Sequence, residues 1–316
     1  MFLDFEKQIA ELEGKIEELR HLSNDGDINI ATEISRLQNK ADQQLKATYQ
    51  KLSPWQKVQV ARHPNRPHFK EVAASLFTDF IPLAGDRYFA EDKAVVAGIG
   101  RFRKRGVIII GTEKGENTKE RIKTNFGMAR PEGYRKARRL MEMAAQFKLP
   151  ILTFIDTAGA YPGIGAEERG QAEAIARTIE KSLAVDVPSI AVILGEGGSG
   201  GAVALATADR VLMLEHAIYS VISPEGCASI LWRSSSHATD AANALKLTAQ
   251  DLKSLNVIDT VIEEPLGAAH RDHKITLERL GNTIEENLND LLSAETENLV
   301  LKRRKKFLNM GVTALI

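Results

Sequence analysis

Hydrophobic side chains recur every three or four residues through the first fifty positions, a spacing that predicts amphipathic helices. The first stripe consists of Phe2, Phe5, Ile9, Leu12, Ile16 and Leu19. The polar stretch 24–27 interrupts the pattern, and a second stripe consists of Ile30, Ile34, Leu37 and Leu45. We expect two antiparallel helices whose apolar faces pack on a partner or on the main domain.

Prolines at positions 54, 64 and 67 mark turns between short helices in the segment 53–90. Beyond it, short apolar runs alternate with helical patterns. The expected strands are 95–99, 107–112, 151–156, 190–194, 211–214, 219–222 and 256–262. The first two are expected to form a hairpin around the basic stretch 101–105. The expected helices are 134–147, 167–185, 202–208, one with Ser223 as its N-cap, one from Thr248, and long helices within 274–310. This alternation predicts an α/β domain over 91–316, preceded by a helical region over 1–90.

The composition of the chain excludes several classes of function. Lysine plus arginine equals aspartate plus glutamate at 42 each, so no whole-chain field favours nucleic acid or a membrane. The single cysteine, Cys227, excludes a disulfide within the chain and a cysteine-rich zinc site. The start of the chain has no signal-peptide pattern, and no apolar run approaches 18 residues. We expect a soluble, cytoplasmic protein with no metal site of its own.

The sequence contains two basic segments to which we assign no specific function. The run 302–306 is expected to be a solvated helix end. Residues Arg130, Arg135, Lys136, Arg138 and Arg139 are expected to form a solvated or subunit-facing surface, with attraction of an anionic substrate or of coenzyme A phosphates as the alternative.

The most informative stretch is a buried strand at 190–194 followed by five glycines, Gly195, Gly197, Gly198, Gly200 and Gly201, and then by an apolar helix. Glycine lets the backbone turn sharply and approach a ligand. The first N–H groups of the helix have no partner within it and can bind an oxygen or an anion.

A second small-residue loop, 156–163, follows the strand at 151–156. In a parallel sheet both loops leave the same edge, so their N–H groups can converge on one oxygen and form an oxyanion hole. Two ordinary strand-to-helix turns remain the simpler interpretation.

The glycine stretch also satisfies two other patterns. Residues 195–200 fit the dinucleotide fingerprint, with Glu215 as the ribose-binding acid. Residues 197–201 fit a nucleophile elbow at Ser199, which would need His216 or His237 as its base. A nucleotide-hydrolase interpretation of 156–159 fails because the chain has no phosphate-binding loop with the matching lysine.

Four stretches, 125–136, 156–163, 195–202 and 219–232, together resemble the alpha subunits of bacterial acetyl-CoA carboxylase carboxyltransferases. The resemblance covers essentially the whole chain. It implies a crotonase-like fold of repeated ββα units, with an N-terminal helical extension and C-terminal helices. It also implies transfer of the carboxyl group of carboxybiotin to acetyl-CoA, which gives malonyl-CoA for fatty-acid synthesis.

The resemblance also implies partners: a beta subunit in an α2β2 heterotetramer, the biotin carboxyl carrier protein that bears the biotin, and biotin carboxylase. Zinc is expected on the beta subunit only, which would also supply most of the acetyl-CoA site.

The implied site residues follow from the matching motifs. The N–H groups of Gly200 and Gly201 form the oxyanion hole for biotin. The surrounding carboxybiotin site consists of Gly197, Gly198, Ala158, Gly159, Ala160, Ser223, Pro224, Glu225 and Gly226.

Two competing classes stay open. An enoyl-CoA hydratase or isomerase on the same fold would need a carboxylate pair, for which Glu167, Glu168 and Glu196 are the candidates. A scaffold subunit that uses its long helices to bind a partner would not depend on the loop glycines.

Overall fold

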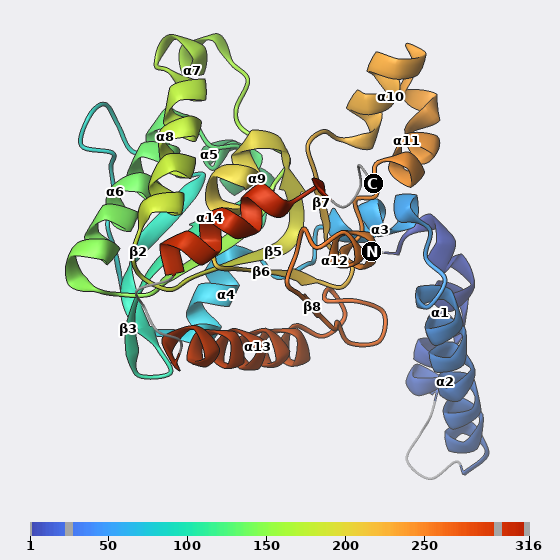
Figure 1. Cartoon of the computed structure of the whole chain (residues 1–316). Coiled ribbons are helices and arrows are strands. Elements are labelled where there is room, and N and C mark those ends of the chain that lie inside the picture. The colour runs from blue at the N-terminus through green and yellow to red at the C-terminus, as the bar shows by residue number, and fades with distance from the viewer. Residues whose placement is uncertain (1, 23–27, 294–298, 313–316) are drawn as a thin grey trace.

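An eight-stranded mixed sheet with helices on both faces forms the body of the molecule in this computed structural model, which describes residues 2–22, 28–293 and 299–312 (Figure 1). The sheet order is β1-β2-β3-β4-β5-β6-β8, and β7 pairs with β5. The strands are β1 (Phe77–Pro82), β2 (Val95–Phe102), β3 (Arg105–Thr112), β4 (Ile151–Thr157), β5 (Ser189–Gly198), β6 (Arg210–Leu214), β7 (Ile218–Ser220) and β8 (Thr260–Ile262).

The helices in the described part of the chain are α1 (Lys7–Leu22), α2 (Ile28–Tyr49), α3 (Pro54–Ala61), α4 (Phe69–Leu76), α5 (Thr118–Lys123), α6 (Pro131–Phe147), α7 (Ile164–Glu168), α8 (Gln171–Ala184), α9 (Ser199–Ala206), α10 (Pro224–Trp232), α11 (Ala238–Ala244), α12 (Ala249–Ser254), α13 (His273–Ser293) and α14 (Leu299–Asn309). None of them is both long and apolar enough to cross a membrane.

The predicted hairpin is confirmed as the antiparallel pair β2 and β3. Its two-residue turn, Arg103 and Lys104, has positive φ at both positions, which matches the right-handed twist of the flanking strands. The strands from β3 to β8 pair in parallel. Every residue of β4 is buried, as expected for a parallel strand covered on both faces.

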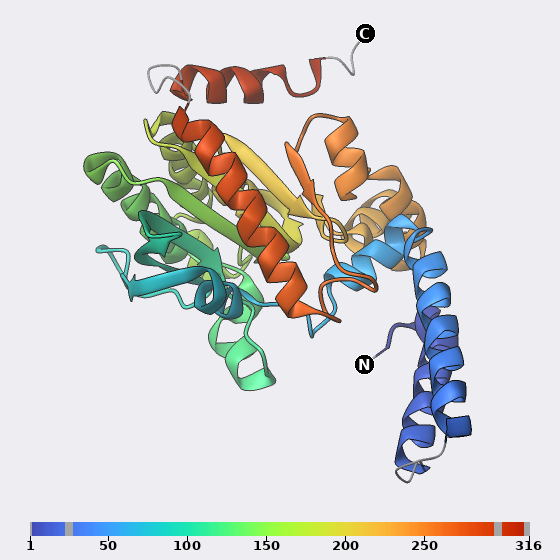
Figure 2. The same cartoon turned by 90° about the horizontal axis from the view of Figure 1, so that it is seen from below.

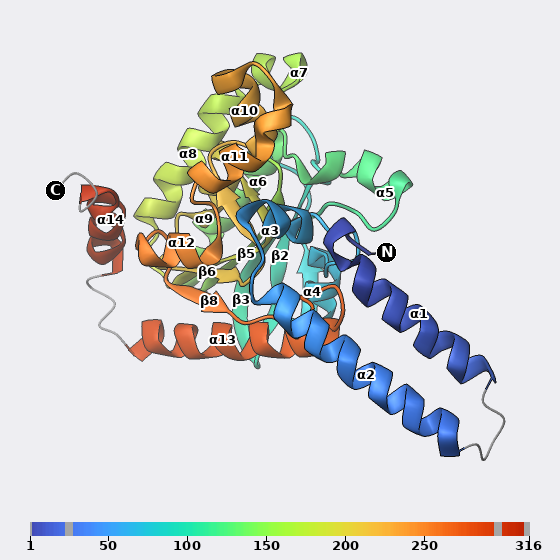
Figure 3. The same cartoon turned by 90° about the vertical axis from the view of Figure 1, so that its right-hand side faces the viewer.

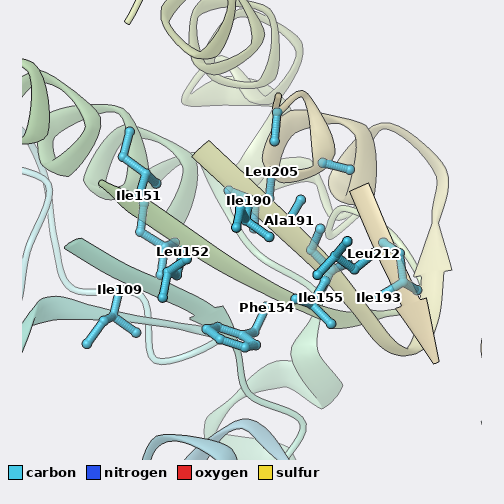
Figure 4. Close-up of a cluster of buried hydrophobic side chains, with 14 of the residues drawn as sticks. Ile109, Ile151, Leu152, Phe154, Ile155, Ile190, Ala191, Ile193, Leu205 and Leu212 are labelled. Atoms are coloured by element: carbon cyan, nitrogen blue, oxygen red, sulfur yellow. The ribbon is translucent and has the colours of Figure 1, made fainter. Parts of the chain in front are cut away.

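One hydrophobic core joins the sheet to its helices. Helix α6 packs on β2 and β3, and α9 packs on β4 and β5. On the opposite face, α13 crosses the strands and contacts α4 and β5 (Figure 2). The centre of this core is aliphatic, with Phe154 among isoleucines and leucines of β3, β4, β5 and β6 (Figure 4).

The two N-terminal helices form the predicted hairpin, which extends away from the sheet (Figure 3). The predicted break at 24–27 lies outside the described residues. Towards the tip of the hairpin the apolar stripes of α1 and α2 pack against each other, and Ile16, Leu37 and Ala41 are buried there. At its base, Ile9 packs with Val60 and Ala268, so the stripe joins the hairpin to the main body.

Several elements differ from the expectations; for example, the strand expected over 256–262 is only Thr260–Ile262. Strand β1 lies in a region expected to hold only turns and short helices, and it pairs with β2; the division of the chain at residue 90 stays a prediction. The helix expected over 167–185 is two helices, because Gly170 with φ of 79° separates them. Strand β5 continues four residues past the predicted end at 194, through Gly197 and Gly198.

The expectation of a solvated helix end at 302–306 is wrong for Arg303, which is 1% exposed. Its guanidinium forms a two-point ion pair with Asp209, at 2.8 and 2.7 Å, and donates to the carbonyls of Ser182, Val185 and Val187. Lys306 pairs with Asp259 at 2.5 Å. The basic run therefore fixes α14 to the edge of the sheet.

We predict that Arg303→Met lowers the free energy of unfolding by about 3–5 kcal/mol, because it leaves the buried Asp209 carboxylate without its counter-charge. Arg304→Met is the matched control, since Arg304 is exposed on the same helix. Chemical denaturation of both variants measures the difference. Equal stability of the two variants would contradict the buried ion pair.

Candidate functional site

The glycine stretch is a strand that turns directly into a helix. Gly197 and Gly198 still pair with Tyr219 and Ser220 of β7. Helix α9 then begins at Ser199, whose φ is 55°. Residues 198–200 are partly accessible, whereas Gly201 is buried. The turn thus presents backbone to the surface at the end of a buried strand.

The turn packs backbone to backbone against the loop after β4. A Cβ atom at Gly198 would lie 2.1 Å from the carbonyl oxygen of Ala158, and one at Gly201 would lie 2.7 Å from the backbone nitrogen of Ala160. Real Cβ atoms do not approach backbone this closely. At Gly200 a Cβ would meet only Ile175, at 3.8 Å. Glycine is therefore required at 198 and 201 by contact, but not at 200.

Backbone donors converge where the two loops meet. Gly200 and Gly201 belong to the first turn of α9, whose N–H groups have no carbonyl partner inside the helix. Within the part of the chain that the structure describes, no loop carbonyl or side chain accepts from them either. Such N–H groups bind an oxygen that carries negative charge.

The second loop shapes the site, but the structure shows no free donor at Gly159. Gly159 has φ of 152°, in the region that favours glycine, and its N–H donates to the hydroxyl of Thr157 at 3.1 Å. That N–H is therefore already engaged. The predicted contributions of Ala158 and Ala160 stay predictions; both lie at the accessible side of the contact with the glycine turn.

The start of α10 is brought to the site by β7, because Ser220 pairs with Gly198 and α10 begins at Pro224. Ser223 caps the helix as predicted: its hydroxyl accepts the N–H of Gly226 at 3.1 Å. Pro224 is buried, and Glu225 is held by Arg62 at 2.5 Å. The structure thus brings all three predicted segments together.

A charged cluster that sequence reasoning missed lies directly beside the glycine turn. Glu196 pairs with Arg62 at 2.6 Å and with Lys114 at 3.0 Å, and Lys114 also pairs with Asp156 at 2.7 Å. A cavity of about 190 Å³ adjoins the cluster and is lined in part by Arg62, Lys114 and Ala158. The cluster joins residues up to 134 positions apart in the chain, and no local pattern indicates it.

The cluster removes the carboxylate that a hydratase would need. Burial acts to raise the pKa of Glu196, but Lys114 and Arg62 outweigh burial and hold that pKa below its ordinary value. Glu196 therefore stays ionised and paired, unlike a proton-exchanging acid. Glu167 and Glu168 are exposed on α7 and do not pair with it in the described structure.

The geometry does not support a nucleophile elbow at Ser199 or a dinucleotide site at the glycine stretch. His216 packs edge-on against Tyr49 at the base of the N-terminal hairpin, and His237 contacts Asp240. Among the described residues, neither histidine hydrogen-bonds to Ser199, so the nucleophile elbow has no base. Glu215, the proposed ribose-binding acid, instead accepts the N–H of Glu264 at 3.1 Å.

The expectation of a solvated or subunit-facing basic surface at 130–139 is wrong for two of its residues. Arg135 is buried between Asp86 and Glu132, at 2.8 and 3.0 Å. Lys136 is 1% exposed and pairs with Glu91. These cations stabilise the fold of the 86–92 loop on α6 and are not available to an anionic ligand.

Comparisons with known proteins show which family this chain belongs to. A family model described as acetyl co-enzyme A carboxylase carboxyltransferase-like matches residues 2–311. The chain is 63% identical over 314 residues to the acetyl-coenzyme A carboxylase carboxyl transferase subunit alpha of Rhodospirillum centenum, with 99% of each chain covered. It is also 63% identical, over 313 residues, to the protein of that name from Paramagnetospirillum magneticum, again with 99% of each covered.

Solved structures match in fold. A transcarboxylase 12S structure with methylmalonyl-coenzyme A and methylmalonic acid bound superimposes with a TM-score of 0.60 at 18% identity, over 73% of this chain and 42% of that one. A Pseudomonas malonate decarboxylase hetero-tetramer in complex with coenzyme A gives 0.57 at 15% identity, over 70% and 89%. The expected crotonase-like carboxyltransferase fold is confirmed.

The close contact between the two loops can be tested by substitution of the glycines at the turn. We predict that Gly198→Ala lowers the free energy of unfolding by about 1–3 kcal/mol, because the new methyl group overlaps backbone of the neighbouring loop. Gly200→Ala, two residues away, should leave stability unchanged or slightly higher. Denaturant unfolding of the two variants separates these outcomes, and equal losses would show that the loops do not touch as described.

Proposed function

Since this chain belongs to the family of carboxyltransferase alpha subunits of acetyl-CoA carboxylase and is an enzyme subunit, we propose that the turn 197–201 is its carboxybiotin site. The observation that carries this proposal is the pair of N–H groups at Gly200 and Gly201. They lie in the first turn of α9, at an accessible turn that the loop 157–160 holds from behind.

The residues fit a substrate whose oxygen gains negative charge. Carboxybiotin supplies the carboxyl group and, once that group has left, a ureido nitrogen that can take the α-proton of acetyl-CoA. The N–H groups of Gly200 and Gly201 stabilise the charge on the ureido oxygen. Removal of one such preorganised donor typically costs about 3–4 kcal/mol of barrier.

The remaining proposed residues hold and orient the biotin ring. Gly197, Gly198 and the loop Ala158, Gly159, Ala160 form the floor against which the ring rests. The capped first turn of α10, Ser223 to Gly226, forms the wall beside it. No protein side chain needs to act as the base in this scheme, which agrees with the engaged state of Glu196.

We further propose that a beta subunit completes the site in an α2β2 assembly in the cytoplasm and carries the zinc and most of the acetyl-CoA site. The biotin carboxyl carrier protein and biotin carboxylase are the further proposed partners. The Pseudomonas malonate decarboxylase that shares this fold is itself a hetero-tetramer. A division of the reaction between two subunits also fits a site here that consists of backbone donors alone.

The proposed surface for the beta subunit is the apolar C-terminal end of α10 together with Val221, which lies before the helix. It consists of Val221, Ile230, Leu231 and Trp232, which are exposed. Exposed apolar groups that are contiguous with a site are typical of an interface. Helix α10 begins at the proposed carboxybiotin wall, so a subunit seated on this face would also reach the reacting groups.

The decisive experiment measures malonyl-CoA decarboxylation with biocytin for three samples: this chain, its beta subunit, and the mixture. We expect activity only in the mixture. In the mixture, Gly200→Val should lower kcat by about 10²–10³-fold, because the branched side chain covers the N–H donors, while the protein stays folded, since a Cβ atom at this position meets only Ile175 at 3.8 Å.

Val203→Ala, on the same helix, is the control for Gly200→Val and should retain activity. Full activity of Gly200→Val would contradict the assignment of the turn. Activity of this chain alone would contradict the shared site. Silence of all samples, with complex formation shown by sedimentation, would favour a scaffold subunit instead.

Leu231→Asp should weaken binding to the beta subunit by at least about tenfold, because a carboxylate would be buried in an apolar contact. Leu301→Asp is the matched control, since Leu301 has the same exposed fraction of 64% but lies on α14. Calorimetric titration of each variant with the beta subunit measures the affinity. If both variants bind as the unchanged protein does, the interface lies elsewhere.

A further inference from the structure

We propose that Lys114 and Arg62 are positioning residues of the carboxyl-transfer site, which they hold through Glu196. The inference rests on the proposed function of the glycine turn and extends it to two cations that lie outside the sequence motifs. Neither cation contributes an atom to the proposed carboxybiotin site. Each fixes a different wall of it, so their losses have different kinetic consequences.

Lys114 acts at an irregularity in the sheet. Strands β4 and β5 pair regularly as far as Ile155 and Ile193, and the next pair is Thr157 with Gly197. In this interval β5 has three residues, 194–196, opposite the single residue Asp156 of β4, and these two extra residues break the backbone ladder immediately before the glycine turn. The N–H of Glu196 finds its partner in a side chain instead, the Asp156 carboxylate, at 2.8 Å.

The ammonium group of Lys114 holds both carboxylates of that irregularity, Asp156 at 2.7 Å and Glu196 at 3.0 Å. Burial acts to lower the pKa of Lys114, but the two carboxylates outweigh burial and raise it, so the side chain stays charged. Without this cation two buried carboxylates would face each other across the irregularity. Their repulsion would move the strand end that leads into Gly197 and Gly198.

Arg62 acts on the opposite wall. It follows the last residue of α3, and its guanidinium spans from Glu196 at 2.6 Å to Glu225 at 2.5 Å. Glu225 lies in the first turn of α10, within the proposed wall of the carboxybiotin site. Arg62 therefore sets the distance between the end of β5 and α10.

Removal of Lys114 and removal of Arg62 should affect different kinetic constants. Lys114→Met displaces the strand that carries the oxyanion donors, and donors that are about 1 Å out of place cost roughly 10²-fold in rate. We expect kcat to fall by about 10–100-fold with little change in KM. Arg62→Met frees the wall but leaves the donors in place, so KM for biocytin should rise by about 5–20-fold with kcat within about threefold.

The experiment uses the complex with the beta subunit and measures kcat and KM for biocytin in malonyl-CoA decarboxylation. Lys70→Met is the matched control, because Lys70 pairs with Glu120 at the surface, outside the cluster. Arg62→Lys should recover only part of the KM effect, since a single ammonium nitrogen cannot reproduce the contacts that separate guanidinium nitrogens make with Glu196 and Glu225. Glu196→Gln keeps the backbone N–H and the shape, and should combine both defects.

Amide hydrogen exchange provides a readout that does not depend on turnover. Peptides covering 196–201 should exchange faster in Lys114→Met, and peptides covering 222–232 should exchange faster in Arg62→Met, each without a change in the other. If the wild-type complex is active and the variants match the Lys70 control in kinetics and exchange, the positioning role is overturned while the proposed function stands. If the wild-type complex is inactive, the exchange pattern alone decides whether the two cations hold these walls.

Discussion

The contact between two loop backbones is the constraint on which this site depends. The turn after β5 touches the loop after β4 so closely that positions 198 and 201 have no room for a Cβ atom. Main-chain groups held in this way cannot change rotamer, so N–H donors at the turn are already oriented before any ligand arrives. An oxyanion site gains its effect from such preorganisation, because no reorganisation accompanies the reaction.

Buried ion pairs hold the segments that surround this contact. Arg66 binds Glu264 at 2.8 Å and also donates to the carbonyl of Leu194 on β5. Burial acts to raise the pKa of Glu264, but Arg66 outweighs burial and lowers it to about 2, so the pair stays charged. Arg303 and Asp209 serve the edge of the sheet in the same way. Removal of one partner from a buried pair is costly, so each pair favours a single arrangement of its two segments.

The cluster around Glu196 places this kind of pair next to the proposed site. The Arg66–Glu264 pair joins two loops, and the Arg303–Asp209 pair joins α14 to the loop before β6, whereas here the pairs bridge a break in the sheet and reach α10. The backbone ladder is interrupted at this irregularity, and the charged side chains hold together the segments that the missing ladder bonds would have joined. The site thus combines an open strand end with a fixed geometry.

The sequence by itself determined most of the strands and helices after residue 90, the β2–β3 hairpin and the capped start of α10, because each depends on local periodicity or on one or two turn residues. It also indicated the glycine turn and the family, because both lie in contiguous motifs. Only the tertiary structure decided the rest. It showed that β5 runs on through its glycines, that Arg135, Lys136 and Arg303 are buried rather than solvated, and that Arg62, Lys114 and Asp156 meet at Glu196. A charged side chain looks the same in sequence whether water or a distant carboxylate neutralises it, and only the packing of remote segments distinguishes the two.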